Sequence, residues 1–536
     1  MPARRLFLPC LAAVALRAGT LSWEALEARG TRLSAVEIRV QNVFDLSDPV
    51  QDTWVGRLAD RLHLTTRDAV IRRMLTFRAG DRVDARQIHE VERELRAHRF
   101  IKDARIDPEL RPDGSVAAMV RVRDAWTLKA SGGYGRVGGQ PSWGFGLRDR
   151  NILGSGKDFG IHHDRNLDQS STTFLYQDPQ FLGSRWTLST SYKALSDGQE
   201  RSLDLGRPFF ALDTPWSMDV AAASGRSLLR IYDRQALVYT SLDVWAKGDL
   251  GAAWLARLDE GSALRLGMRI QAEDHRYGPL SSPAPPGALP PPSLASRRLR
   301  GPALTWDWLQ DGFRTFRDLQ GMDTPEDYNL GWSGRGAAGV FTRAWGSTGT
   351  GPFFALDLAK GWAPGKRSLV LLQTGASGRE LAGRFENGLG SLGLTAYAWH
   401  LPRQVLAANL ALDLAVRPDP ENLLYLGGEE GMRGYPSFMH PGDRRWMASF
   451  EDRILTEWRW LGMLRAGFVV YADAGAIRRL DGTGWTRPYS DLGAGLRFGD
   501  LKSSLGRVVL LTVAVPLARE PGQDRYQVLV GNTVRF

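Results

Sequence analysis

The sequence is poor in the two residue types that most often bind transition metals. It contains one cysteine, Cys10, and eight histidines among 536 residues. Beyond Cys10 the chain has no thiol for a disulfide or for a cysteine-ligated zinc or iron–sulfur site. Only His162 and His163 are adjacent, and neighbouring residues of a strand point to opposite faces, so this pair does not chelate one ion. We expect no metal site, and the lack of further cysteines suits an oxidising compartment.

Long apolar runs are also missing. No segment offers about 18 uninterrupted apolar residues, so a transmembrane helix is not expected. The apolar run Leu6–Leu16 follows Arg4 and Arg5, which is the layout of a secretory signal, and it is shorter than the roughly 20 residues of a membrane-spanning helix. We expect residues 1–22 to be a signal peptide with no clear cleavage site. A buried helix of the mature protein is the alternative.

Motifs of catalysis and of nucleotide binding are absent as well. The G-x-G-x-x-G pattern at 133–138 leads into another strand-like segment rather than a helix. The segment "GSGKD" at 154–158 has Asn151 and Asp158 where a phosphate loop needs glycine and a hydroxyl residue. "GRS" at 225–227 lacks the G-x-S-x-G elbow of a serine nucleophile. The sequence therefore predicts neither an enzyme nor a bound cofactor.

The formal net charge is +10, which raises the question of a nucleic-acid partner. The basic residues are scattered along alternating segments, and no basic helix or nucleic-acid motif is present. We therefore expect no nucleic-acid partner. Contact with an anionic membrane surface, including the lipid bilayer and lipopolysaccharide, is the simpler interpretation of the charge.

Composition divides the chain into two parts. Residues 1–124 hold 5 of the 59 glycines and 2 of the 18 tryptophans. The rest of the chain has the glycine and aromatic bias of a large β structure. We expect a domain boundary near Asp124, with a small α+β domain at 35–124 and a β domain at 125–536.

The first part has the pattern strand, helix, helix, strand, strand. Alternating apolar residues predict a strand beginning at Val36, and the apolar face Val70–Leu75 predicts a helix. Asp84 followed by Gln87 predicts a helix start. The turn at 111–114 separates the last two strands. Together these elements predict a compact domain with an exposed strand edge.

The second part alternates with a period of two. In the segment 465–477, small and apolar residues such as Phe468 alternate with a set that contains Tyr471, Asp473 and Gly475. One face suits lipid and the other a polar lumen, as in a transmembrane β-barrel. Only helices and closed barrels satisfy every backbone group within a membrane. We therefore expect an all-β transmembrane barrel; a soluble β-sandwich is the alternative.

The last strand and one loop carry further signals. The sequence ends in a strand with an aromatic residue at its terminus, and five residues share one face of it, broken by Asn532: Tyr526, Val528, Val530, Val534 and Phe536. The glycine-rich segment 427–438 carries one arginine, Arg433, and lies in the third long outer loop counted from the end of the chain. An arginine at a flexible tip raises the question of a fixed partner, and its planar guanidinium suits a bidentate pair with a carboxylate. The alternative is an arginine with no fixed partner.

These features resemble the BamA/TamA-like outer-membrane superfamily. "MRGY" at 432–435, after "LGG" at 426–428, resembles its (V/I)-R-G-(F/Y) loop signature, with Met432 in place of the branched residue. "YADAG" at 471–475 resembles its F-x-D-x-G strand motif, with Tyr471 in place of phenylalanine. The terminal strand resembles the C-terminal insertion signal of such barrels. Further similar motifs are "RNILGSG" at 150–156, "YQDPQFLG" at 176–183, "RPFFALD" at 207–213 and "FEDR" at 450–453.

The resemblance implies a fold and a site. The fold is a barrel of 16 antiparallel strands preceded by one polypeptide-transport-associated (POTRA) domain at 35–124. The signature loop, 422–444, folds into the barrel. The residues expected to lock it there are Arg433, Gly434, Tyr435, Asp473 and Gly475. Glu451 and Arg497 also fall on lumenal faces, and we expect them to join this network.

The resemblance also implies a function without catalysis. The expected role is assembly, insertion or translocation of outer-membrane proteins, with client strands templated at the seam between the first and last barrel strands. The POTRA domain, in the periplasm of a Gram-negative-type cell, would capture unfolded outer-membrane or secreted clients and accessory periplasmic proteins or lipoproteins. The alternative is that this domain is only a spacer that holds the barrel in position. The alternatives for the whole protein are a secretion pore for a single partner and a structural or lipid-handling barrel.

Overall fold

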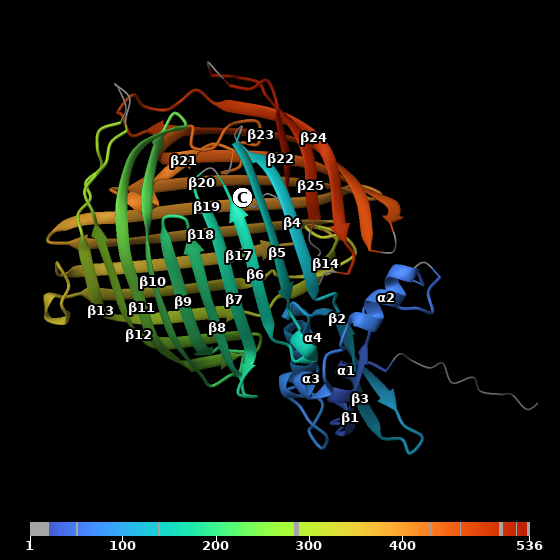
Figure 1. Ribbon diagram of the computed structural model, residues 1–536. Coiled ribbons are helices and arrows are strands. Elements are labelled where there is room, and N and C mark those ends of the chain that lie inside the picture. The colour runs from blue at the N-terminus through green and yellow to red at the C-terminus, as the bar shows by residue number, and fades with distance from the viewer. Residues whose placement is uncertain are drawn as a thin grey trace, which may run out of the picture.

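The chain folds into a small α+β domain and a large closed β-barrel (Figure 1). The computed structural model describes residues 21–49, 52–137, 140–166, 168–283, 289–428, 430–460, 463–502, 508–520 and 523–532. The predicted signal peptide lies outside these residues except for Leu21 and Ser22, and so do Val534 and Phe536 of the terminal strand.

The N-terminal domain has three strands and four helices. A three-stranded sheet of order β1-β3-β2 pairs β1 parallel and β2 antiparallel to β3. As the Asp84 and Gln87 pair predicts, the Asp84 carboxylate accepts a hydrogen bond from the Gln87 N–H (2.8 Å) at the start of α4. Two helices, α1 and α2, add to the predicted pattern. The elements are α1 (Trp23–Ala28), β1 (Leu33–Gln41), α2 (Trp54–Leu62), α3 (Asp68–Met74), α4 (Ala85–Ala97), β2 (Ile101–Leu110) and β3 (Val116–Asp124).

The barrel wall has more strands than the resemblance implies. Over the described residues, the closed ring contains twenty full strands, β4–β13, β16–β20 and β22–β26, rather than 16. The short β21 pairs with β22 but is not counted as a full strand of the ring, because β20 pairs with β22 directly. The count of 16 came with the resemblance. The sequence gives no turn signal for some hairpins, because a turn such as Arg234–Gln235 contains neither glycine nor proline.

The strands of the ring follow one another as hairpins, and β26 lies beside β4 to close it. Their bounds are β4 (Leu128–Val137), β5 (Gln140–Asp149), β6 (Asp158–Arg165), β7 (Ser170–Phe181), β8 (Trp186–Leu195), β9 (Gly198–Arg207), β10 (Trp216–Asp233), β11 (Ala236–Asp259), β12 (Ser262–Tyr277), β13 (Arg297–Gln310), β16 (Trp332–Phe341), β17 (Gly351–Trp362), β18 (Ser368–Leu381), β19 (Arg384–Leu401), β20 (Gln404–Val416), β21 (Leu424–Leu426), β22 (His440–Trp460), β23 (Leu464–Arg479), β24 (Tyr489–Asp500), β25 (Val508–Pro516) and β26 (Gln527–Asn532).

The two faces of the wall differ as the alternation predicts. In β23, Phe468 and Val470 are 36% and 54% exposed on the outside, whereas Tyr471 and Asp473 are each 2% exposed on the inside. An apolar outer face and a polar inner face are typical of a transmembrane β-barrel. None of the described helices is long and apolar enough to cross a membrane.

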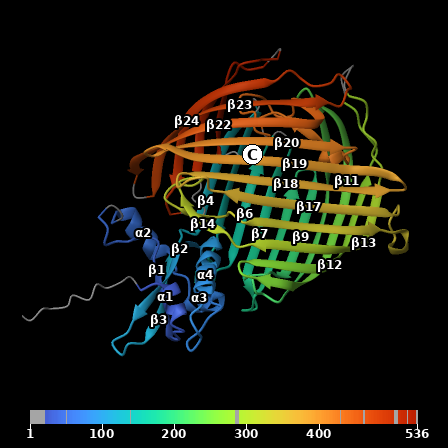
Figure 2. The ribbon, with the colours of Figure 1, turned by 180° about the vertical axis from the view of Figure 1, so that it is seen from behind.

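The N-terminal domain packs against one end of the barrel, here called the domain end (Figure 2). The Arg67 N–H donates to the Gly154 carbonyl oxygen (3.0 Å), and the Leu212 N–H donates to the Glu90 carboxylate (2.7 Å). Arg185 pairs with Glu94, whose pKa is raised to about 7 because it is buried there. The interface therefore excludes much of the water around α4.

Two connections between wall strands fold inward from opposite ends. The outer loop, residues 417–439, joins β20 to β22 at the far end, opposite the domain. The inner hairpin, residues 311–331, joins β13 to β16 at the domain end and contains β14 (Phe313–Arg317) and β15 (Pro325–Asn329), which pair with each other. Figure 1 shows β14 between the domain and the rest of the barrel.

Candidate functional site

The tip of the outer loop is buried inside the barrel. Arg433 is 2% exposed and Tyr435 is not exposed at all. The Tyr435 hydroxyl lies 2.8 Å from the Ser490 carbonyl oxygen, to which it donates. Gly434 lies so close to the wall that a Cβ at this position would be 2.6 Å from the Cβ of Asp491. Glycine is therefore required here for close approach, and the tip is fixed on both sides of the arginine.

Arg433 is bound by three polar side chains. Its Nε and Nη2 atoms each donate to the Asp473 carboxylate at 2.7 Å. Its Nη1 donates to Glu451 (2.6 Å), and Nη2 also donates to the Ser449 hydroxyl (3.0 Å). The guanidinium carbon lies 3.4 Å from the centre of the Tyr471 ring. This is the bidentate, stacked geometry that arginine provides and lysine does not.

Strand alternation and register bring these partners together. Asp473 in β23 lies opposite Ser449 in β22, and Tyr471 lies opposite Glu451. All four side chains point to the lumen from neighbouring strands, so one guanidinium reaches them all. Gly475, two residues beyond Asp473, lies against the loop, since a Cβ there would be 3.1 Å from the Met432 sulfur.

A further carboxylate, Asp491, lies beside this group and was not among the predicted residues. Asp491 is fully buried and stands opposite Asp473 in the β23–β24 register. Two buried carboxylates on facing positions repel each other when both are charged, so this pair calls for a shared proton or for a positive charge such as that of Arg433 beside Asp473. The alternation of residues 491–498 places Asp491 on the lumenal face, but only the register shows that it faces Asp473.

A second group of buried charges connects the outer loop to the inner hairpin. Arg453 pairs with Glu451 (2.7 Å) and donates to the Leu319 carbonyl oxygen of the hairpin (2.6 Å). Arg497 is 1% exposed and donates to the Gln320 carbonyl oxygen (3.3 Å). Arg497 thus contacts the hairpin rather than Arg433. Arg453 lies within the "FEDR" motif but was not singled out in the sequence.

The N-terminal domain binds the inner hairpin at the domain end of the barrel. In α4, Arg93 pairs with Asp311 (3.2 Å) and Arg96 pairs with Asp327 (3.0 Å). Lys102 in β2 donates to the Thr324 hydroxyl (2.6 Å), and burial lowers the pKa of Lys102 to about 8. A continuous series of polar contacts therefore runs from the domain through the inner hairpin and Arg453 to Arg433.

The two arms of the outer loop span the far end of the barrel. Asp419 is bound by Arg379 of β18 (2.6 Å) and by Arg297 of β13 (3.2 Å). On the other arm, Phe438 stacks on Tyr232 of β10 with ring centres 4.4 Å apart. Because β10 and β13 lie about nine and six strands away from β22 around the ring, the loop crosses the mouth of the barrel.

One cluster offers metal-ligating atoms. Glu273, His275 and Glu421 each present a ligand atom within 4.8 Å of the others. Arg297, however, also pairs with Glu421 and lies 2.9 Å from Glu273. Its guanidinium already supplies a positive charge between these carboxylates, so a metal ion would be repelled. The cluster is better understood as an anchor for the outer loop.

The lumen is not filled evenly. The pair Arg335 and Asp357, on β16 and β17, faces inward with side chains 75% and 58% exposed. Arg269 and Asp219, on β12 and β10, form a second, partly exposed pair (3.0 Å). The part of the lumen beside these strands is therefore open to water, whereas the part between the outer loop and inner hairpin is packed and dry.

Only part of the predicted terminal signal can be placed. Tyr526 precedes β26 and is 60% exposed, and Val528 and Val530 of β26 are 37% and 36% exposed. These three apolar side chains lie on the outer, lipid-facing surface beside the seam with β4. Val534 and Phe536 fall beyond the described residues.

Substituting alanine for Gly493 is expected to disturb the site without touching Arg433. A Cβ at position 493 would overlap the ring of Tyr471, which would move this ring away from the guanidinium. We expect Gly493→Ala to lower the free energy of unfolding by about 1–3 kcal/mol, the usual range for overpacking. Gly393→Ala is the matched control, because a Cβ there meets one atom, at 3.9 Å. Denaturant titration in detergent micelles measures both, and equal losses would contradict the expectation.

Fold and site together define a transmembrane β-barrel whose lumen holds an ion-paired outer loop above a small docked domain. The chain is similar to the solved structure of BamA from Haemophilus ducreyi lacking POTRA domains 1-3, at 14% identity and a TM-score of 0.39, over 92% of this chain and 84% of that chain. It is also similar to CdiB from Escherichia coli (13% identity, TM-score 0.48, 94% and 76% covered) and to CdiB from Acinetobacter baumannii (11%, 0.42, 94% and 73%). No family model and no curated protein matches the chain.

Proposed function

We propose that the protein is an outer-membrane assembly or translocation factor without enzymatic activity. The N-terminal domain lies in the periplasm, the outer loop faces the cell surface, and the clients are unfolded outer-membrane or secreted proteins. The domain captures a client segment, and the seam between β4 and β26 then templates its strands. Accessory periplasmic proteins or lipoproteins would bind through the same domain.

The observation that carries this proposal is the buried lock around Arg433. A passive porin needs a continuous water passage and no fixed loop across its mouth. Here the loop crosses the mouth and is held by a bidentate pair with Asp473 and a contact with Glu451. Buried ion pairs contribute little net stability, and their best-attested use is to fix one specific arrangement. A lock of this kind suits a barrel that must hold one conformation while its wall handles a client.

The N-terminal domain supplies a surface for an extended segment. Strand β1 is at the edge of its sheet, since the order is β1-β3-β2, and residues 80–83 pair with this edge only as far as Leu33. A groove of about 650 Å³ runs beside this edge and is lined by Ser34 and Val36 of β1 and by Arg72 of α3. An unpaired edge binds an extended peptide through main-chain hydrogen bonds, while the groove accepts its side chains.

A second function, a secretion pore for one exported partner, is favoured by a different observation. The exposed ion pair of Arg335 and Asp357 lies in the water-filled part of the lumen. Such a passage is what an unfolded chain would follow if the outer loop moved aside. In this alternative the lock is a gate, and clients pass through the lumen rather than along the seam.

Depletion of the protein, followed by quantitative proteomics of the outer membrane, tests the proposal. We expect many β-barrel proteins to fall in abundance, because each needs templating at the seam. Loss of one secreted or surface protein would instead support the dedicated pore. An unchanged protein content would contradict both functions and would favour a structural or lipid-handling barrel.

A further inference from the structure

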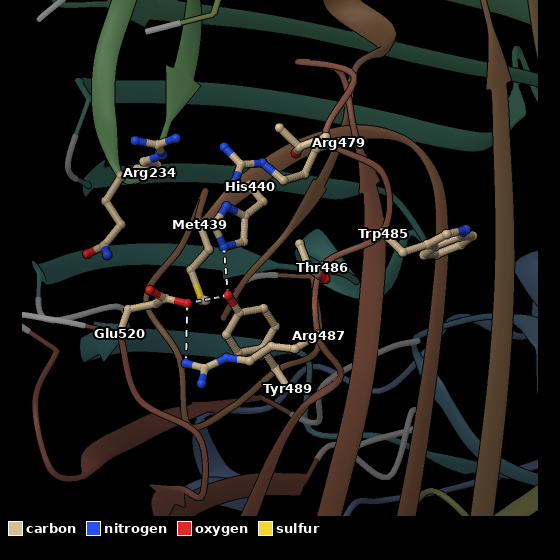
Figure 3. Close-up of a pocket in the computed structure, with 11 residues that line it drawn as sticks. Arg234, Met439, His440, Arg479, Trp485, Thr486, Arg487, Tyr489 and Glu520 are labelled. Atoms are coloured by element: carbon tan, nitrogen blue, oxygen red, sulfur yellow. Dashed lines mark hydrogen bonds and ion pairs between the residues drawn. The ribbon is translucent and has the colours of Figure 1, made fainter. Parts of the chain in front are cut away.

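A cavity of about 500 Å³ opens at the far end of the barrel (Figure 3). Four parts of the chain line it: the turn Arg234–Gln235 between β10 and β11, the junction of the outer loop with β22 at Met439 and His440, the connection between β23 and β24, and Glu520 after β25. Its volume is in the range of small-molecule sites, and none of its residues takes part in the lock itself.

The cavity carries an excess of positive charge. Arg479 pairs with Asp481 (2.7 Å), and Arg487 pairs with Glu520 (3.3 Å). Within the described part of the chain, the Arg234 guanidinium has no hydrogen-bond or ion-pair partner, although it lines the cavity. Figure 3 shows Arg234 across the cavity from Arg479 and His440. Arg234 acts on Asp481 only through its charge and not through a contact, so its guanidinium can still bind an anionic group.

The position of Arg234 comes at a conformational cost. Arg234 and Gln235 have φ angles of 51° and 70°, in the left-handed region that glycine and asparagine adopt more readily. The turn is held in this shape because the Gln235 N–H donates to the carbonyl oxygen of Phe438 in the outer loop (3.0 Å). The outer loop thus fixes the arginine at the edge of the cavity.

His440 adds an unsatisfied polar atom to the same cavity. It is only 6% exposed, and its Nε2 lies 2.9 Å from the Tyr489 hydroxyl. Tyr489 donates its own proton to Glu520, so His440 Nε2 must be the donor to Tyr489. The other ring nitrogen, Nδ1, is then a buried acceptor, and it has no partner among the described residues. Such an acceptor calls for an O–H or N–H group from a ligand.

We propose that this cavity binds an anionic saccharide, that is, a sugar bearing a phosphate or carboxylate group. Arg234 and its neighbouring arginines bind the anionic group, and a sugar hydroxyl donates to His440 Nδ1. The source is either a glycolipid of the outer leaflet or a soluble anionic sugar, since both offer this chemistry. The proposal rests on the proposed function only in placing this end of the barrel at the cell surface.

Occupancy of the cavity would also stabilise the locked loop. Met439 and His440 are the residues through which the loop enters β22. Tyr489 packs edge-to-face on Tyr435 of the loop tip, with ring centres 5.3 Å apart. A ligand that binds His440 therefore favours the conformation in which the loop is inside the barrel, because binding to one state raises its population.

Calorimetric titration of the full-length protein in detergent micelles tests the site, with galacturonate, glucose 6-phosphate, inorganic phosphate and galactose as probes. We expect galacturonate and glucose 6-phosphate to bind, and Arg234→Gln to weaken both by about tenfold or more, since a charge-assisted hydrogen bond is lost. Arg343→Gln is the matched control, because Arg343 is exposed in a different far-end connection. Thermal unfolding of each variant shows that it has folded.

The outcomes separate the possibilities. No binding of the charged sugars, equal binding of galactose, equal binding of inorganic phosphate alone, or an unchanged affinity in Arg234→Gln would each overturn the proposal. The source is then found by adding vesicles of phospholipid with and without lipopolysaccharide. A rise in the unfolding temperature with lipopolysaccharide beyond that with galacturonate identifies a membrane glycolipid, and no rise with lipopolysaccharide identifies a soluble sugar. These results do not depend on the depletion experiment, so either proposal can fail alone.

Discussion

Replacing Arg433 by alanine is expected to abolish client assembly and to lower the free energy of unfolding of the barrel by about 3–5 kcal/mol. The change leaves Asp473 buried without its bidentate donor and leaves Glu451 with Arg453 alone, and Asp491 lies opposite Asp473 as a further buried acid. Removing one partner of a buried pair is far more costly than the net worth of the pair, because an uncompensated charge stays behind. Denaturant titration in micelles measures the loss, and outer-membrane proteomics measures the assembly defect.

Arg335→Ala is the matched control for Arg433→Ala. Arg335 is also a lumenal arginine paired with an aspartate, Asp357, but both side chains are largely exposed. Exposed pairs contribute about 0–1 kcal/mol, so this variant should keep both stability and function. Arg433→Lys should fall between the two, since lysine restores the charge but not the bidentate grip. A barrel that loses Arg433 and unfolds at the same denaturant concentration as the wild type would contradict the lock.

Deleting residues 313–330 is expected to open the domain end of the barrel. The ends of the inner hairpin meet, because a Cβ on Gly312 would lie 2.6 Å from the Gly331 nitrogen, so these two glycines can form the new turn. The deletion removes Leu319 and Gln320, which Arg453 and Arg497 contact, and so connects the dry part of the lumen with the wet part. We expect a clear rise in single-channel conductance in planar bilayers. Unchanged conductance would show that the hairpin does not restrict the lumen.

Point variants distinguish the blocking of the lumen by the inner hairpin from the attachment of this hairpin to the N-terminal domain. Arg96→Ala removes the contact with Asp327 but leaves the hairpin in the chain. We expect it to speed protease cleavage between the domain and the barrel while conductance stays low. Arg105→Ala is its control, because Arg105 is 64% exposed and makes only a long contact with Asp103 (3.8 Å).

The sequence predicted the site best where alternation applies. The period of two in residues 465–477 places Tyr471, Asp473 and Gly475 on the lumenal face, which is where they lie. It does not predict register, and register decides that Asp491 faces Asp473. Single-strand patterns cannot show which residues of neighbouring strands meet, because that depends on turn geometry and bulges along the whole wall.

The inner hairpin was missed for a different reason. Its two strands are short and polar, "FRTFR" at 313–317 and "PEDYN" at 325–329, and they lack the period of two that marks a wall strand. Whether such a strand joins the ring or folds inside it depends on tertiary contacts, here with Arg93 and Arg96 of the domain. For the same reason, the strand number could not be derived from local pattern.

The contacts of Arg433 also bear on the order in which the chain folds. Arg433 and Asp473 are 40 residues apart, and Tyr435 and Ser490 are 55 apart. Closing the ring, in contrast, requires β26 to meet β4 from the other end of the barrel sequence. Short separations cost less chain entropy and form faster than long ones. We therefore expect the C-terminal hairpins and their loop to form first and closure of the ring to be the slow, late event.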